Sequence, residues 1–220
     1  MGKEINLLDN YPRTKRPIEE RAQLVTEQHR AMAREFGQEY FDGDRLHGYN
    51  GYNYHPRFWQ ATVKRIRDHY GLAADARILD VGCAKGFMLH DFQELMPLAT
   101  LAGIDVSEYA IANAKESVAP FLRVGDARAI PYENGYFDLV ISINTVHNLK
   151  IEDCKNALHE IQRVSKSHSF IVVDAWTNEE EQKNLLMWNL TAETYMHADD
   201  WKTVFAEVGY TGDYYWFIAE

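Results

Sequence analysis

The sequence predicts an α/β fold, in which helices cover both faces of a mostly parallel sheet and a helical lid precedes the sheet. From about residue 77 onward, short apolar runs alternate with amphipathic segments, a pattern typical of strands joined by crossover helices. The first apolar run leads into a cluster of small residues at positions 82–86. We expect residues 1–72 to form the lid and residues 73–220 to form the core of one compact unit.

The N-terminal part predicts two helices separated by an aromatic segment. Residues 1–16 are expected to form a loose polar lead-in, followed by a helix over residues 17–36 that has Pro17 in its first turn. A second helix is expected over residues 56–70. The segment between them, residues 40–59, is rich in tyrosine, histidine and glycine.

Within the core, the sequence predicts six strands and four helices. Strands are expected over residues 77–81, 101–106, 121–125, 137–143, 169–174 and 210–219. Helices are expected over residues 86–95, 107–117, 152–164 and 199–208. Ser107 is placed as an N-cap and Gly209 follows the end of the last helix.

The composition of the chain argues against nucleic-acid-binding, membrane-spanning and secreted proteins. The net charge of -10 argues against nucleic acid as the main partner, because binding phosphates needs clustered Lys and Arg. No apolar run approaches the roughly 20 residues that span a bilayer, and the N-terminus lacks the apolar region of a signal peptide. The two cysteines, Cys83 and Cys154, favour a reducing compartment. A cytoplasmic protein without a membrane partner is therefore expected.

The small residues at positions 82–86 mark a ligand-binding turn, since small side chains let the backbone approach a ligand closely. A dinucleotide fingerprint would need its third small residue at position 87, which is Phe87. The acid two positions before the first glycine, Asp80, would also be unfavourable beside a diphosphate. The spacing therefore argues against a nicotinamide dinucleotide.

The run from Asp80 to Gly86 resembles motif I of the class I S-adenosylmethionine (SAM) dependent methyltransferases. The segment 131–140 resembles the run before the fourth strand in small-molecule members with a type 11-like methyltransferase domain. This resemblance implies a Rossmann-like fold, with SAM as cofactor and S-adenosylhomocysteine (SAH) as product. The family's middle glycine is replaced by Ala84, so we expect a slightly crowded turn. The implied loop contacts are Gly82, Cys83, Ala84 and Gly86, with Asp80 suited to the cationic end of SAM.

Two further acids follow the next two strands. Asp105 ends the second strand, where a carboxylate can accept hydrogen bonds from both ribose hydroxyls of a nucleoside. The resemblance implies that Asp126 accepts a hydrogen bond from the adenine amino group, with the backbone of Ala127 nearby. Val106 is expected to form an apolar wall for the adenine ring, and Asn144 to contact cofactor or acceptor.

His147 is the candidate catalytic residue. It follows the fourth strand, at the carboxyl edge where open α/β sheets bind their ligands, and an unperturbed imidazole titrates near neutrality. We expect it to act as a base or to orient the acceptor. The alternative is that it caps the next helix or lines the cofactor site.

The acceptor site is expected to involve the aromatic segment before residue 60. Tyr49, Tyr52 and His55 are candidate acceptor contacts on a loop that could close over the sheet, although such tyrosines also pack simply on a domain surface. Trp176, after the fifth strand, is either a wall of this pocket or part of the core. No metal is expected, because the sequence lacks the usual ligand spacings.

We therefore expect a methyltransferase that acts on an oxygen or nitrogen of a small molecule such as a sugar or biosynthetic intermediate. The alternative is a catalytically silent, methyltransferase-like scaffold. The [ND]-P-P-[YF] run of enzymes that methylate nucleic-acid bases is absent after the fourth strand, which again argues against a nucleic-acid acceptor. A homodimer is compatible with the sequence. The family's antiparallel C-terminal hairpin is either abbreviated or completed by residues 188–196.

Overall fold

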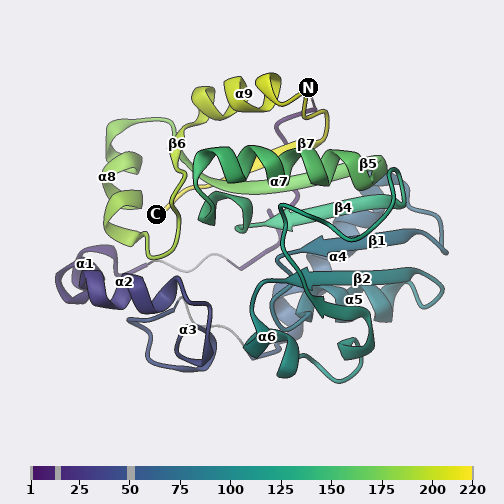
Figure 1. Cartoon of the computed structure of the whole chain (residues 1–220), viewed down its shortest axis with the longest axis horizontal. Coiled ribbons are helices and arrows are strands. Elements are labelled where there is room, and N and C mark those ends of the chain that lie inside the picture. Colours follow the sequence, from purple (N-terminus) through teal and green to yellow (C-terminus); the bar gives the residue numbers. More distant parts are fainter. Residues whose placement is uncertain (1, 13–15, 49–52, 220) are drawn as a thin grey trace.

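A seven-stranded sheet forms the centre of the protein. The computed structural model describes residues 2–12, 16–48 and 53–219 (Figure 1). The strands are β1 (Arg77–Val81), β2 (Thr100–Asp105), β3 (Leu122–Val124), β4 (Phe137–Ile143), β5 (Ser165–Trp176), β6 (Met196–His197) and β7 (Asp213–Phe217). Their order is β3-β2-β1-β4-β5-β6, with β7 also paired to β5. All pairings between these strands are parallel, which confirms the predicted fold class.

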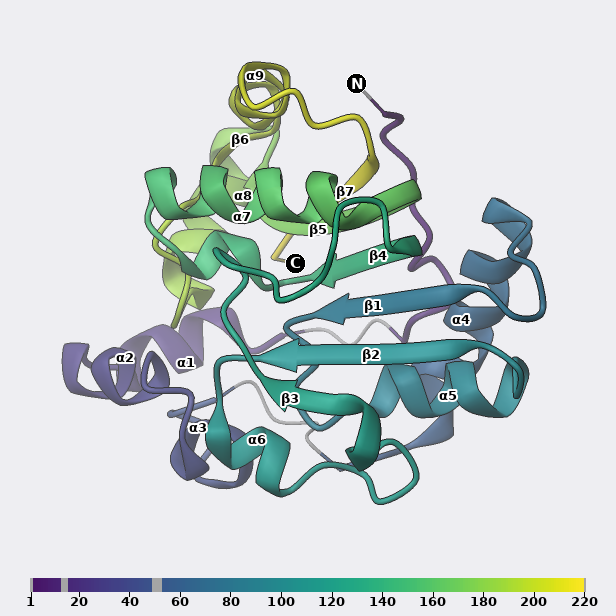
Figure 2. The ribbon, with the colours of Figure 1, turned by 45° about the vertical axis from the view of Figure 1, so that its right-hand side comes forward.

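Helices cover both faces of the sheet (Figure 2). One face carries α4 (Pro56–Tyr70) and α5 (Phe87–Leu95), and the other carries α7 (Ile151–Val164) and α9 (Ala198–Glu207). Alternate strand residues enter the two cores, as in β1, where Ile78 packs with α4 and α5 whereas Leu79 packs with α7. The short helix α6 (Glu108–Ala112) follows β2 and packs near β3.

The N-terminal lid differs from the prediction of one long helix over residues 17–36. It contains α1 (Ile18–Leu24), α2 (Glu27–Ala33) and α3 (Gln38–Asp42). The chain is extended at Val25, and the Thr26 side chain accepts a hydrogen bond from the backbone N–H of His29, whose ring in turn accepts from the N–H of Thr26. This reciprocal capping starts a new helix and explains why the single-helix prediction was wrong.

The C-terminal part contains no antiparallel hairpin among the described strands. After α8 (Glu179–Trp188), the two-residue strand β6 pairs with Ala175 and Trp176 at the end of β5. The crossover helix α9 then brings β7 back parallel to β5. The segment that follows α8 thus supplies an additional edge strand, but because β6 runs parallel to β5 it does not complete an antiparallel hairpin.

The first residues of the chain belong to the sheet, contrary to the expected loose lead-in. The N–H of Tyr214 donates to the carbonyl of Lys3, and the N–H of Ile5 donates to the carbonyl of Tyr214. Leu7 is 1% exposed and packs in the core beside α4 and α5. Residues 3–5 therefore extend the sheet beyond β7. In the described part of the chain, no helix combines the length and apolarity needed to cross a bilayer.

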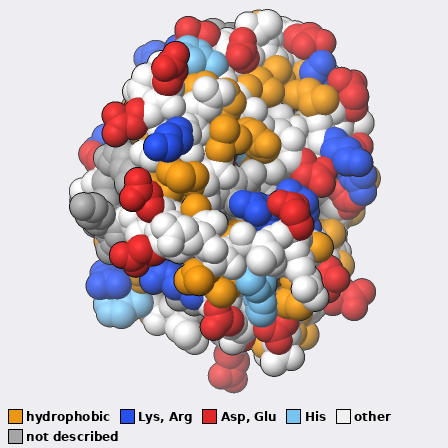
Figure 3. Space-filling view, turned by 90° about the vertical axis from the view of Figure 1, so that its left-hand side faces the viewer, with side chains coloured by type: hydrophobic (Ala, Val, Ile, Leu, Met, Phe, Trp, Pro, Cys, Tyr) orange, Lys and Arg blue, Asp and Glu red, His pale blue; other side chains and the backbone are white. Residues whose placement is uncertain are grey.

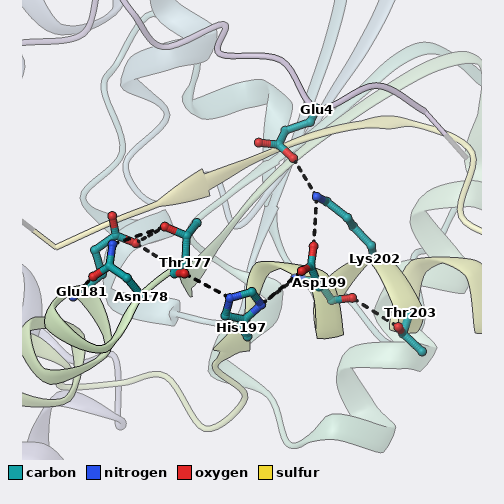
Figure 4. Close-up of polar contacts among 8 residues, drawn as sticks. All are labelled: Glu4, Thr177, Asn178, Glu181, His197, Asp199, Lys202 and Thr203. Carbon is teal, nitrogen blue, oxygen red and sulfur yellow. Dashed lines mark hydrogen bonds and ion pairs between the residues drawn. The ribbon is translucent and has the colours of Figure 1, made fainter.

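A polar network on the surface fastens these terminal elements together (Figure 4). Lys202 on α9 lies 3.3 Å from carboxylate oxygens of both Glu4 and Asp199. The His197 ring bonds the N–H of Asp199 through Nδ1 and the carbonyl of Thr177 through Nε2. The network thus joins the N-terminal segment to α9, and β6 to the turn before α8.

Gly103 on β2 is a sensitive packing position. A Cβ at this residue would lie 2.6 Å from Leu122 Cδ2 and 2.8 Å from both Cys83 Sγ and Leu89 Cδ1. We expect Gly103→Ala to lower the free energy of unfolding by about 1–3 kcal/mol through overpacking, measured as a lower urea midpoint. Gly37→Ala is the control, because nothing lies within 4 Å of its Cβ position. Equal midpoints for the two variants would contradict the packing argument.

Candidate active site

A cavity of about 1320 Å³ lies at the carboxyl edge of the sheet. The strands point their carboxyl ends toward the lid helices (Figure 1), and Figure 3 views the molecule from this side, where charged and hydrophobic side chains are interspersed. The predicted cofactor residues that line the cavity are Asp80, Gly82, Cys83, Ala84, Asp105, Val106, Asp126, Ala127 and Asn144. The catalytic candidate His147 lines the same cavity. Gly86 is the one predicted loop residue outside the described lining.

The glycine-rich loop takes a left-handed path that its sequence dictates. Gly82, Ala84 and Gly86 have φ values of 84°, 48° and 76°. A Cβ at Gly82 would overlap the Thr145 side chain, and one at Gly86 would meet Leu122. Ala84 adopts its positive φ without being glycine, a conformation that costs an L-residue roughly 1–2 kcal/mol. The crowding expected there stays a prediction. Gly86 therefore shapes the turn through its positive φ and its close packing against Leu122, although it does not line the cavity.

Asp105 holds this loop in place. Its Oδ2 accepts a hydrogen bond of 2.8 Å from the N–H of Ala84, and its Oδ1 accepts one of 2.8 Å from the N–H of Ser107. Each carboxylate oxygen has two lone pairs, so both retain capacity to accept a further donor. Burial raises the pKa of Asp105, while these two N–H groups oppose the increase.

Asp80 is a carboxyl group whose surroundings suit a cation. It is 4% exposed, and its pKa is raised to about 8, mainly by burial and further by the nearby charge of Asp105. A positively charged ligand group next to Asp80 would stabilise the ionised carboxylate. The ammonium and sulfonium of SAM meet this requirement, so the residues present fit the cofactor.

The predicted adenine contact, Asp126, is already engaged. The guanidinium of Arg128 donates to both of its carboxylate oxygens, with the shortest distance 2.6 Å, and also lies 2.9 Å from Asp153. The hydrogen bonds from Arg128 lower the pKa of Asp126. Beside it, Val106 is 60% exposed although apolar, as expected of a wall that a ring would cover. The adenine role of Asp126 stays a prediction.

His147 and Asp174 form a buried polar pair beside the cofactor residues. The N–H of Asp174 donates to Nδ1 of His147 over 2.9 Å, and Asp174 Oδ1 lies 3.6 Å from His147 Nε2. Burial lowers the pKa of His147 to about 3 and raises that of Asp174 to about 7, which Arg16 partly offsets. The imidazole is therefore neutral, with Nδ1 as acceptor and the proton on Nε2.

The predicted acceptor residues are not brought together in the described structure. Tyr49 and Tyr52 lie outside the described residues. His55 is exposed and caps α4 by accepting a hydrogen bond from the N–H of Arg57, and it is not among the described lining. Trp176 is half-buried and packs against a small core beside α8, again outside the described lining. Their roles as acceptor contacts stay predictions.

Lid residues complete the cavity. Tyr40, Phe41, Arg45, Arg57, Phe58 and Trp59 lie in the segment predicted to form the acceptor site, whereas sequence reasoning missed Tyr11, Arg16, Arg34 and Phe36. An ion pair closes the lid on the cofactor loop, since Lys85 Nζ lies 2.6 Å from Asp42, which also accepts a hydrogen bond from Tyr109. The aromatic composition of residues 40–59 was the available signal, but it did not identify the arginines. Among the described residues, no cluster of three potential metal ligands is found.

Comparison with known proteins identifies the domain. A family model described as a methyltransferase domain matches residues 79–173. The tRNA (carboxymethyluridine(34)-5-O)-methyltransferase of Arabidopsis thaliana is 32% identical over 59% of this chain and 31% of that protein. The demethylmenaquinone methyltransferase of Lactococcus lactis is 31% identical over 60% of this chain and 52% of that protein. The chain thus spans just under a third of the first relative's length and about half of the second's.

Solved structures agree with this identification at the level of the fold. The crystal structure of the YcgJ protein from Bacillus subtilis matches with a TM-score of 0.55 at 17% identity, over 66% of each chain. The chain therefore contains a segment, residues 79–173, that matches a methyltransferase domain, its fold is Rossmann-like, and the residues of the cavity fit SAM as cofactor.

The raised pKa of Asp80 predicts that cofactor binding depends on pH. Below pH 8 its carboxyl group is largely protonated in the free protein, so binding an ammonium group must release a proton. Affinity for SAH should increase from pH 6 to 7.5, by up to about tenfold per unit. Calorimetry in two buffers of different ionisation enthalpy measures both affinity and proton release. Asp80→Asn should abolish the dependence, and a pH-independent affinity of the unaltered protein would contradict this prediction.

Proposed function

We propose that this chain transfers the methyl group of SAM to an oxygen or nitrogen of a small molecule, such as a sugar or biosynthetic intermediate. The observation that carries the proposal is one continuous cavity that contains the cofactor residues, the His147–Asp174 pair and the inner surface of the lid. Its volume of about 1320 Å³ exceeds the roughly 300–1,000 Å³ typical of single-ligand sites. Such a space suits a cofactor together with an acceptor.

The residues of the chain would act mainly by positioning. SAM supplies the activated methyl group, so the protein needs to hold donor and acceptor in line and keep water out. Asp105 and Asp80 would fix the ribose and the cationic end of the cofactor. The lid, closed through Lys85 and Asp42, would cover the reacting groups.

The geometry of His147 supports the acceptor-orienting part of its predicted role. Its Nδ1 is occupied by the N–H of Asp174, and its pKa of about 3 leaves it a weak base at neutral pH. The remaining N–H at Nε2 can donate a hydrogen bond to an oxygen or a nitrogen lone pair of the acceptor. His147 would therefore hold the acceptor with its lone pair directed at the methyl group.

A nucleic-acid acceptor is the main rival, because the Arabidopsis relative is named as a tRNA methyltransferase. Two observations favour the small molecule. The chain has a net charge of -10, which disfavours a polyphosphate backbone. The lid also contributes much of the cavity lining, so the reacting groups lie beneath it rather than on an open surface.

The cofactor part of the proposal is tested through Asp105. Asp105→Asn should weaken SAH binding at least tenfold in calorimetry, because the amide loses the charge and an acceptor for the ribose hydroxyls. Asp138→Asn is the matched control. Asp138 lies at the amino end of β4, away from the cavity, and accepts a hydrogen bond from the N–H of Arg77. Absence of SAH binding by the unaltered protein would contradict the proposal and favour a silent scaffold.

The role of His147 is tested by His147→Gln, with the exposed His159→Gln as control. We expect turnover to fall about 10- to 100-fold, with the dissociation constant of SAH changed less than twofold. Turnover is measured as transfer of radiolabelled methyl groups to the best acceptor from a screen of sugars, amines and hydroxy acids. Because Asp174 and Asp80 have pKa values of about 7 and 8, a titration near neutrality in the pH profile of the unaltered enzyme should persist in His147→Gln. Unchanged turnover in His147→Gln would remove this residue from the mechanism.

A further inference from the structure

We infer that the acceptor is a small anion, bearing a carboxylate or phosphate on an apolar, planar body, and that lid arginines bind its charged group. This inference rests on the proposed methyl transfer and specifies its substrate class. It comes from the uneven distribution of charge around the cavity and from the aromatic rings that accompany the arginines.

The two sides of the cavity carry opposite charges. Among the described residues, the charged side chains that the lid contributes to the lining are Arg16, Arg34, Arg45, Arg57 and Glu35. Those from the core are Asp80, Lys85, Asp105, Asp126, Arg128 and Asp174. Both core cations are neutralised, because Lys85 pairs with Asp42 and Arg128 pairs with Asp126. An excess of positive charge therefore faces the cavity from the lid of a strongly acidic protein.

Two of the lid arginines converge on one aromatic group. Both Arg16 and Arg57 act on the half-buried Tyr11, where their charges oppose the increase of its pKa that burial causes. The Tyr11 ring packs 5.3 Å from the ring of Phe58 and 4.9 Å from that of Trp59. The Arg57 guanidinium also lies 4.7 Å from the ring centroid of Phe58, so a cation accompanies this aromatic wall, on which a planar ligand body would stack.

Arg16 also connects this wall to the proposed reaction centre. Its guanidinium lies 4.7 Å from the ring centroid of Phe217 and 5.6 Å from that of Trp188, both of which line the cavity. Its charge also lowers the pKa of Asp174, which neighbours His147. A guanidinium in this position can form paired hydrogen bonds with a carboxylate or phosphate while the acceptor atom reaches His147.

The carboxyl groups on the acceptor side do not cancel this positive charge. Burial raises the pKa of Asp174 to about 7, so a large fraction of it is neutral at neutral pH. Glu35 offsets one of the four lid arginines, and Glu35, Arg34, Arg45 and Arg57 are all exposed to solvent, where charges are screened. The half-buried Arg16 is therefore the least screened of the lid cations. The arginines line a partly open cavity in a protein of net charge -10, and this net charge favours a compact anion over an extended polyanion such as RNA.

The test compares two fluorescent probes of matched shape. Anilinonaphthalene sulfonate is an aromatic anion, and N-phenyl-1-naphthylamine has the same rings without the charge. Each is titrated into SAH-saturated full-length protein, after calorimetry has confirmed SAH binding. We expect the anion to bind at least tenfold more tightly than the neutral probe. Arg16→Gln and Arg57→Gln should each weaken the anion roughly tenfold and leave the neutral probe and SAH within twofold.

Arg67→Gln is the matched control, because Arg67 lies on α4 with Arg57 but pairs with Asp68 outside the described lining. Equal affinity for the two probes, or Arg16 and Arg57 variants that bind the anion as the control does, would overturn the inference.

In a second experiment, labelled SAM is offered with hydroxybenzoates, their methyl esters, or unfractionated tRNA. Transfer to the acids and not to the esters supports it, whereas transfer only to the esters or to tRNA overturns it. Failure of SAH to bind contradicts the proposed function instead.

Discussion

The carboxylate of Asp105 is the group on which the rest of the site depends. Through Ala84 it holds the left-handed glycine loop, and through Ser107 it fixes the chain as it leaves β2. The Ser107 hydroxyl in turn donates to the carbonyl of Phe36, where the lid begins to turn into α3. One side chain at the end of one strand thus connects cofactor loop, sheet and lid, and the cavity exists because these three parts keep a fixed relation.

Much of the core could be predicted because its signals are local. The apolar strand ending at Val81, the small residues that follow it and the acids at strand ends require no knowledge of distant contacts, and the structure places Asp80, Asp105 and Asp126 around one cavity. The break at Thr26 was missed because side-chain capping competed with helix periodicity. The pairing of Lys3 and Ile5 with Tyr214 could not be predicted, since it joins segments more than 200 residues apart.

His147 shows why a motif does not determine a protonation state. Its position after β4 was readable from the sequence, and an unperturbed imidazole would titrate near neutrality. Burial removes that property by lowering the pKa, and the hydrogen bond from the N–H of Asp174 to Nδ1 defines the tautomer of the neutral ring. The lid arginines could not be identified from the sequence either. They are isolated residues in a polar segment, and only the fold brings them around one cavity.

Because residues 3–5 pair with Tyr214 on β7, the lid is attached to the core at both of its ends. Its first end is held at the β7 edge of the sheet and its other end continues into α4, which packs on the core. A segment attached at both ends can open only by changing its own backbone conformation. Its opening motions are therefore smaller, and its closing faster, than those of a free terminus. Removing residues 1–5 would therefore take away the attachment at the sheet edge without removing any residue that lines the cavity, and would leave the lid held by Leu7 and by its contacts with Lys85 and Ser107.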